Sequence, residues 1–118
     1  MIAPSSVLIP HTSALRWETM ASVESAGRSF ELVDVSSGDE HYWRLLRDRW
    51  ATGVDLTVVE QDVVVPADTI DRFDACESEW CFHSYRLWWG DAADVYGIIP
   101  LGCVRFRAPL MAAHPDLF

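Results

Sequence analysis

The sequence contains no lysine, so its nine basic residues are all arginine, against eighteen aspartates and glutamates. The formal charge of -9 argues against a nucleic-acid backbone or an anionic membrane as a partner. A phosphorylated ligand stays compatible with this charge, because a bound cation inverts the local field. The absence of lysine is typical of a GC-rich genome and concerns the origin of the chain, not its mechanism.

Long apolar runs are also missing, since no stretch reaches the roughly 18 residues that a membrane span needs. The first ten residues lack the basic start and apolar core of a signal peptide. Three cysteines are few and odd in number, which suits a reducing compartment better than a disulfide framework. We therefore expect a cytoplasmic protein. With 50% hydrophobic residues, the chain predicts one folded domain over residues 1–118.

Strand and helix patterns alternate along the first two thirds of the chain. Segments 7–10, 29–35 and 54–65 predict strands, and a helix is predicted after each of them. The helices are expected over residues 13–26, over 37–53 and from Pro66 onward. The order β-α-β-α-β-α favours a parallel sheet with right-handed crossovers. Residues 103–106 predict a further strand, and 108–113 a short helix.

Local signals indicate where these helices begin and which side they bury. Ser37 and Glu40 form the pattern of a capping box, and Gly27 and Gly53 are expected to end the first two helices. Helical spacing predicts the inward side chains: Ala14, Trp17 and Ala21 in the first helix, Trp43, Leu46 and Trp50 in the second, and Ile70 and Phe73 in the third.

Two carboxylates stand in the most apolar strand pattern, Glu60 and Asp62, at spacing i, i+2. Such residues point to the same side of a strand. Two like charges there repel each other and lose solvation, so they are usually paired or bound to a metal. A divalent cation held in this way can in turn hold a diphosphate. The alternative is a strand that ends earlier and leaves two solvated acids in a loop.

Several short segments resemble the GT-A type of glycosyltransferase. They are residues 7–10, 31–36 and 56–66, the pair Trp80-Cys81, and residues 101–106. The sequence is most similar to small glycosyltransferase-like proteins of actinobacteria and of their bacteriophages. The resemblance implies a truncated GT-A-like domain: a Rossmann-like three-layer α/β/α fold with a mainly parallel sheet.

The resemblance also assigns a metal site to the two acids. Glu60-Gln61-Asp62 stands in the place of the D-x-D motif, which holds Mn²⁺ or Mg²⁺ on the diphosphate of a nucleotide-diphosphosugar. The motif here departs from the family pattern, because it begins with glutamate, whose longer arm can still reach a cation.

Nucleotide contacts follow from the same resemblance. Asp34 matches the acid that contacts the nucleobase or ribose, and Pro10, His11 and Thr12 match the loop that lines the nucleotide. All of them end predicted strands, and ligands of open parallel sheets bind at the carboxyl ends of the strands.

The region after residue 77 offers catalytic and sugar-binding candidates. Asp91 and Asp94 are candidates for the base that deprotonates an acceptor hydroxyl, with plain loop solvation as the alternative. Trp88 and Trp89 are candidates for stacking on a sugar, with core packing as the alternative. Trp80 and Phe82, by contrast, are expected in the core.

A rival metal site consists of the cysteines and one histidine, namely Cys76, Cys81, His83 and Cys103. Three thiolates and an imidazole are the right ligands for a closed zinc site, although the C-x4-C-x-H spacing is not a standard knuckle. The alternatives are a disulfide between Cys76 and Cys81, or buried free thiols. Zinc binding would indicate a small zinc-stabilised interaction protein.

The function that the GT-A resemblance implies is metal-dependent binding of a nucleotide-diphosphosugar, with transfer of the sugar. The alternative is a catalytically reduced relative that acts as a nucleotide- or protein-binding module. Such a relative could be encoded by a bacteriophage. A small open sheet also has free edges, through which copies of the chain could pair into a homo-oligomer.

Overall fold

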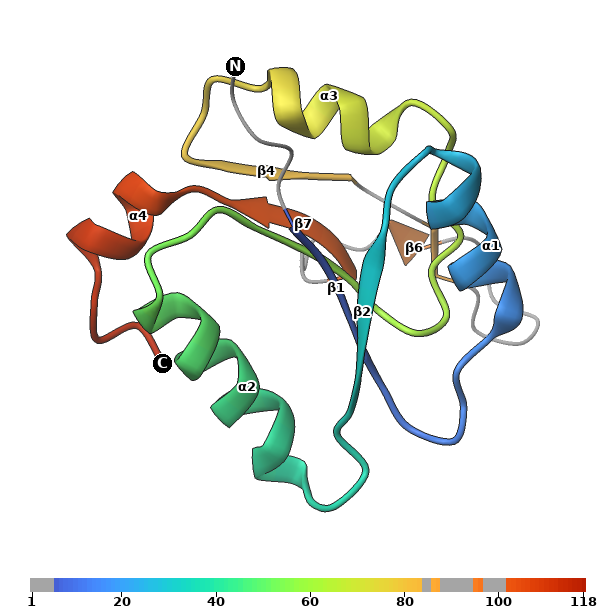
Figure 1. Cartoon of the computed structure of the whole chain (residues 1–118), viewed down its shortest axis with the longest axis horizontal. Helices are drawn as coiled ribbons and strands as arrows, with labels where there is room; N and C mark the ends of the chain where they lie inside the picture. Colours follow the sequence, from blue (N-terminus) through green and yellow to red (C-terminus); the bar gives the residue numbers. More distant parts are fainter. Residues whose placement is uncertain (1–5, 84–85, 88–94, 97–101) are drawn as a thin grey trace.

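The computed structural model describes residues 6–83, 86–87, 95–96 and 102–118, and its main feature is a five-stranded open sheet with four helices (Figure 1). In chain order the elements are β1 (Ser6–His11), α1 (Trp17–Ser25), β2 (Phe30–Asp34), α2 (Asp39–Ala51), β3 (Leu56–Val59), α3 (Thr69–Ala75), β4 (Trp80–Phe82), β5 (Arg86–Leu87), β6 (Val95–Tyr96), β7 (Cys103–Phe106) and α4 (Ala108–Ala113). Strands β5 and β6 pair separately.

The sheet order is β2-β1-β3-β7-β4, and the sheet is mixed. Strands β2, β1 and β3 are parallel, as expected for β-α-β units. Strand β7 runs antiparallel to both β3 and β4. The expectation of a mainly parallel sheet is therefore wrong for this half, because β7 starts at the edge where β3 ends and runs back along it. Parallel neighbours would need a crossover connection at this point.

The two faces of the sheet carry separate apolar clusters, because successive residues of a strand point to opposite sides. Val7 and Ile9 of β1 point into one cluster, and Leu8 points into the other. The first cluster includes side chains of α1 and α3, namely Val23, Ile70 and Phe73. The second includes side chains of α2 and α4, namely Leu46, Trp50 and Met111.

Helix α1 begins later than predicted, and its inward face differs. It starts at Trp17, whose side chain is 69% exposed, while Thr19 and Val23 are buried. The expected stripe of Ala14, Trp17 and Ala21 is wrong because the residues before Trp17 form a turn, in which the Leu15 N–H donates to the Thr12 carbonyl. The predicted stop is confirmed, since Gly27 follows the helix with a φ of +75°.

Helix α2 begins without the predicted capping box. Its N-cap is Gly38, and no side chain caps it. The Ser37 hydroxyl instead pairs with the His41 ring, and the Glu40 carboxylate pairs with Arg44 one turn later. Leu46 and Trp50 are buried as expected. Trp43, in contrast, is 46% exposed. The guanidinium of Arg47 lies over the Trp43 ring, 5.1 Å from the ring centroid.

The later elements match the sequence in part. Ile70 and Phe73 of α3 are buried as predicted, although the helix begins at Thr69 and not at Pro66. Strand β7 and helix α4 have the predicted bounds. The expectation that Trp80 and Phe82 lie in the core is wrong, because β4 is an edge strand and both side chains are about half exposed.

None of the helices in the described part of the chain is long and apolar enough to cross a membrane.

Candidate functional site at the carboxyl ends of the parallel strands

The carboxyl ends of β2, β1 and β3 lie side by side, as the sequence predicted. His11 at the end of β1 is in register with Asp34 at the end of β2. Strand β3, on the other side of β1, ends at Val59, directly before Glu60. The fold thus brings the predicted residues to one edge from three separate segments.

Glu60 and Asp62 lie in a turn and not in a strand. The predicted strand 54–65 extends only over Leu56–Val59, and the Glu60 N–H makes the last bond toward the β7 side, to the Gly102 carbonyl, at 2.9 Å. The Val63 N–H then donates to the Glu60 carbonyl at 3.1 Å and closes the turn. The alternative that the strand ends before Glu60 is therefore correct. Because Glu60 and Asp62 are not in a strand, the i, i+2 spacing does not by itself place their side chains on the same side.

The two carboxylates nevertheless interact. Burial raises the pKa of Glu60, and the negative charge of Asp62 raises it further. The side chain of Glu60 is partly buried and that of Asp62 is exposed. Among the described residues, neither carboxylate has a hydrogen-bonded or ionic partner that could offset this repulsion. A divalent cation held by both carboxylates would offset this repulsion.

A metal site built from protein groups alone is not found in the described part of the chain. No group of three or more histidine, cysteine, aspartate or glutamate side chains there could hold an ion. Two carboxylates would therefore need phosphate or water oxygens to complete the coordination.

Gln61, between the two acids, fixes this turn to the end of β1. Its side-chain oxygen accepts hydrogen bonds from the Thr12 N–H at 2.7 Å and from the Thr12 hydroxyl at 3.0 Å. Its carbonyl accepts from the Arg16 N–H at 3.0 Å and from the Thr19 hydroxyl at 3.0 Å. No local sequence pattern predicts this role of Gln61, because its bond to Thr12 joins residues 49 positions apart.

Asp34 lies exposed at the end of β2 and holds its own loop. One carboxylate oxygen accepts hydrogen bonds from the N–H of Ser36, at 2.8 Å, and from its hydroxyl, at 2.5 Å. These bonds lower the pKa of Asp34, with smaller contributions from the nearby rings of His11 and His41. The carboxylate is therefore ionised at neutral pH, and its side chain is exposed.

The first strand ends in a polar loop. Pro10 is buried, whereas His11 and Thr12 are partly exposed. The Nδ1 atom of His11 lies 3.1 Å from the Thr12 carbonyl. Of the three residues predicted to contact a nucleotide from this loop, only His11 and Thr12 have partly exposed side chains.

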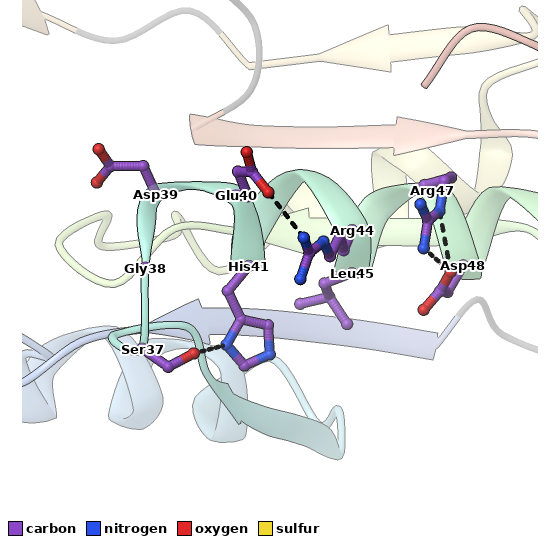
Figure 2. Close-up of a pocket in the computed structure, with 9 residues that line it drawn as sticks. All are labelled: Ser37, Gly38, Asp39, Glu40, His41, Arg44, Leu45, Arg47 and Asp48. Carbon is purple, nitrogen blue, oxygen red and sulfur yellow. Dashed lines mark hydrogen bonds and ion pairs between the residues drawn. The ribbon is translucent and has the colours of Figure 1, made fainter.

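An open pocket lies along the first turns of α2 (Figure 2). Its volume is about 540 Å³, and its lining residues are Ser37, Gly38, Asp39, Glu40, His41, Arg44, Leu45, Arg47 and Asp48. Most charged groups in it are already paired, Arg44 with Glu40 and Arg47 with Asp48 (Figure 2). From the sequence, this segment is predicted only as the start of a helix.

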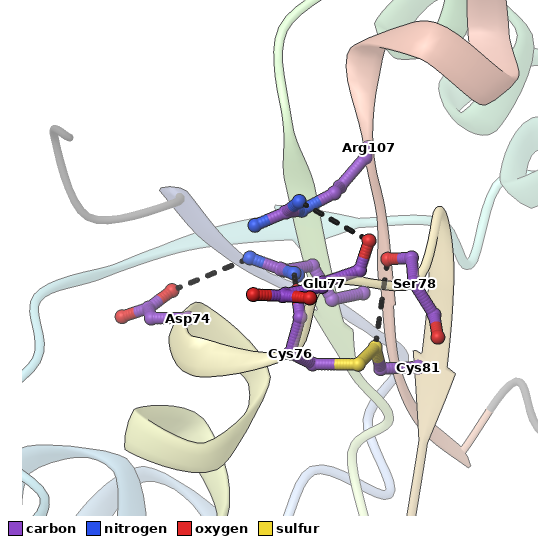
Figure 3. Close-up of a disulfide and its surroundings, with 7 residues drawn as sticks. Asp74, Cys76, Glu77, Ser78, Cys81 and Arg107 are labelled. Carbon is purple, nitrogen blue, oxygen red and sulfur yellow. Dashed lines mark hydrogen bonds and ion pairs between the residues drawn. A yellow bond between two sulfur atoms is a disulfide. The ribbon is translucent and has the colours of Figure 1, made fainter.

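The predicted zinc ligands do not form a metal site. Cys76 and Cys81 are joined by a disulfide (Figure 3), which was one of the alternatives and which contradicts the expectation that the thiols stay reduced. Cys103 is a free thiol, and burial raises its pKa to about 12. The side chain of His83 is exposed, and the backbone N–H of His83 donates to the backbone carbonyl of Cys103. Two sulfurs bonded to each other are not available as thiolate ligands.

The remaining predicted residues, Trp88, Trp89, Asp91 and Asp94, lie outside the described residues.

Comparisons with protein-family models and with curated protein sequences find no match to this chain.

Proposed function

We propose that the protein binds a nucleotide-diphosphosugar at the carboxyl ends of β1, β2 and β3, through a divalent cation, and transfers the sugar. The observation that carries the proposal is the Glu60–Asp62 pair in the turn directly after β3, at the edge of the sheet where β1 and β2 also end. Burial, and in second place the charge of Asp62, raise the pKa of Glu60. The proposal includes a Rossmann-like three-layer domain of the GT-A type and a cytoplasmic location.

Each residue of the site has a distinct part in this proposal. Glu60 and Asp62 hold Mn²⁺ or Mg²⁺, of which Mg²⁺ is commonly bound by one or two carboxylates together with substrate phosphates. When bound, the cation supplies electrostatic stabilisation of the leaving diphosphate. Asp34 accepts hydrogen bonds from the nucleoside with its exposed carboxylate, and Thr12 and His11 line the same side.

Gln61 has a supporting part. Its side chain accepts hydrogen bonds from Thr12, and its backbone carbonyl accepts from Arg16 and Thr19, so these bonds tie the acidic turn to the nucleotide loop. A fixed distance between the cation and the nucleoside loop lowers the ordering cost of binding.

Calorimetry and thermal shift with UDP-, GDP- and TDP-sugars test the proposal, each with and without Mn²⁺. We expect one donor to bind with Mn²⁺ and not with EDTA, and we expect slow release of the free sugar. Asp62→Asn and Glu60→Gln keep the side-chain shape and remove the charge, so both should abolish metal-dependent binding. Asp116→Asn is the matched control, because it removes an exposed carboxylate near the C-terminal residue and should bind as the parent does.

The outcomes separate transfer from binding. Binding without release of sugar to water or to an acceptor would identify the catalytically reduced module. Absence of binding to every donor, with Mn²⁺ present and the fold intact, would overturn the proposal.

A further inference from the structure

The last strand of the sheet, β4, leaves one edge without a neighbour among the described strands. On its paired side, β4 binds β7, with Trp80, Cys81 and Phe82 opposite Phe106, Arg105 and Val104. The Arg107 N–H donates to the Glu79 carbonyl, and the His83 N–H donates to the Cys103 carbonyl. Peptide groups alternate in direction along an antiparallel strand. Residues 79, 81 and 83 therefore face β7, and the N–H and C=O groups of Trp80 and Phe82 face outward.

The side chains of the same two residues form an exposed aromatic pair. Trp80 is 47% exposed and Phe82 is 49% exposed, and their ring centroids are 5.8 Å apart. Trp80 also stacks on Phe106, with 6.3 Å between the ring centroids. Phe106 belongs to the apolar cluster that includes side chains of α2 and α4. The aromatic pair thus extends the apolar face of the sheet to the open edge.

The two edge strands among the described strands differ in charge. Strand β2 carries exposed carboxylates at Glu31 and Asp34, and charges on an edge strand oppose pairing with another strand. Strand β4 has the sequence Trp-Cys-Phe, with no charge and no proline. Any pairing of this sheet with another strand is therefore favoured at β4.

We propose that two copies of the chain associate through their β4 strands, antiparallel, about a two-fold axis at Cys81. In this register Trp80 lies opposite the partner's Phe82, and Phe82 lies opposite the partner's Trp80. Both residues direct their peptide groups outward, so each of the two pairs exchanges two backbone hydrogen bonds. The aromatic side chains meet as cross-strand pairs, which are stabilising in sheets.

The same register places Glu79 opposite the partner's His83, both exposed, on the face of the sheet opposite to the aromatic pairs. The contact is closed, because an isologous pair uses both β4 edges and leaves only the charged β2 edges outside. The five strands of each copy then form one continuous sheet across the dimer.

The dimer is weak, since two three-residue strands bury less than a standard interface. We expect a dissociation constant on the order of 10⁻⁴ M. Each copy carries a charge of -9, so added salt should strengthen the association by screening their repulsion.

Sedimentation velocity over a concentration series tests the proposal directly. The parent chain should change from a monomer of 13.4 kDa toward twice that mass. Phe82→Pro removes an outward N–H and no bond to β7, so it should remain monomeric. Phe82→Lys should do the same, and Leu32→Lys, with the same charge change on exposed Leu32 of β2, should dimerise as the parent does. Circular dichroism confirms that each variant is folded.

Amide hydrogen exchange of the unmodified chain provides a second test of the dimer. The amides of Trp80 and Phe82 should exchange quickly in dilute samples and at least several-fold more slowly in concentrated ones. Four results would overturn the proposal: a monomer at every concentration, an open series of larger oligomers, dimerisation that Phe82→Lys leaves intact, or dimerisation that Leu32→Lys abolishes.

Discussion

The side-chain oxygen of Gln61 accepts two hydrogen bonds from Thr12, one from the backbone N–H at 2.7 Å and one from the hydroxyl at 3.0 Å. This contact joins the turn after β3 to the loop after β1, and both of these belong to the candidate site. The acidic turn therefore owes its position to a neutral residue, and the two carboxylates beside it are left with no partner among the described side chains.

Replacing Gln61 should destabilise the fold and loosen the site. In Gln61→Leu the Thr12 N–H loses its acceptor in a partly buried place, which should lower the free energy of unfolding by about 1–3 kcal/mol. Gln61→Glu keeps an acceptor oxygen but adds a negative charge between Glu60 and Asp62, so it should lose less than Gln61→Leu at high salt, where this repulsion is screened. Urea unfolding of both variants at high salt measures the difference, and equal losses there would show that the hydrogen bonds to Thr12 are not the cause.

The ion pair between Glu31 and Arg49 should make stability depend on pH. Their charged atoms lie 2.6 Å apart, and the hydrogen bond from Arg49 lowers the pKa of Glu31. A lowered pKa stabilises the fold above the pKa of the unfolded chain, and this gain is lost as pH falls through the folded value. Glu31→Gln should therefore reduce stability at neutral pH, by about 0.5 kcal/mol for so exposed a pair, and have no effect in strong acid.

The control for the Glu31 prediction is Glu24→Gln, which changes an exposed glutamate near the end of α1. Its urea midpoint should follow that of the parent at every pH. A Glu31→Gln variant as stable as the parent at neutral pH would show that the ion pair contributes nothing.

Reduction of the Cys76–Cys81 disulfide should weaken the junction between α3 and β4. The bridge closes a short loop, with a sequence separation of 5, so it restricts the unfolded chain modestly. The loop-entropy relation gives about 2 kcal/mol for its removal. The free energy of unfolding of the parent protein, measured by thermal denaturation with and without reductant, should differ by that amount. The Cys76→Ser/Cys81→Ser variant should melt identically in both conditions, and a parent insensitive to reductant would contradict the bridge.

The remaining thiol, Cys103, should be inert in the folded protein. Its side chain is 2% exposed, and burial raises its pKa to about 12, so almost no thiolate forms near about pH 8. A thiol reagent should modify no cysteine in the native, unreduced protein and one cysteine after unfolding in denaturant. Rapid modification without denaturant would show that β7 opens at this position.

The sequence alone determined the order of the first six elements and the meeting of their strand ends. Short connections and alternating patterns force β1, β2 and β3 to run parallel, which places His11, Asp34 and the Glu60 turn at one edge. Gly27 and Gly53 were identifiable as helix ends because a positive φ suits glycine. Strand β7 and helix α4 were also predicted with their observed bounds.

Only the tertiary structure decided the direction of β7, the early end of β3, the exposure of Trp80 and Phe82, and the bond from Gln61 to Thr12. Local sequence patterns report which side of an element is apolar, but they do not report which element lies beside it. An aromatic residue on an edge strand has the same pattern as one in a central strand. The difference lies in the neighbour, and neighbours are set by contacts between residues far apart in the chain.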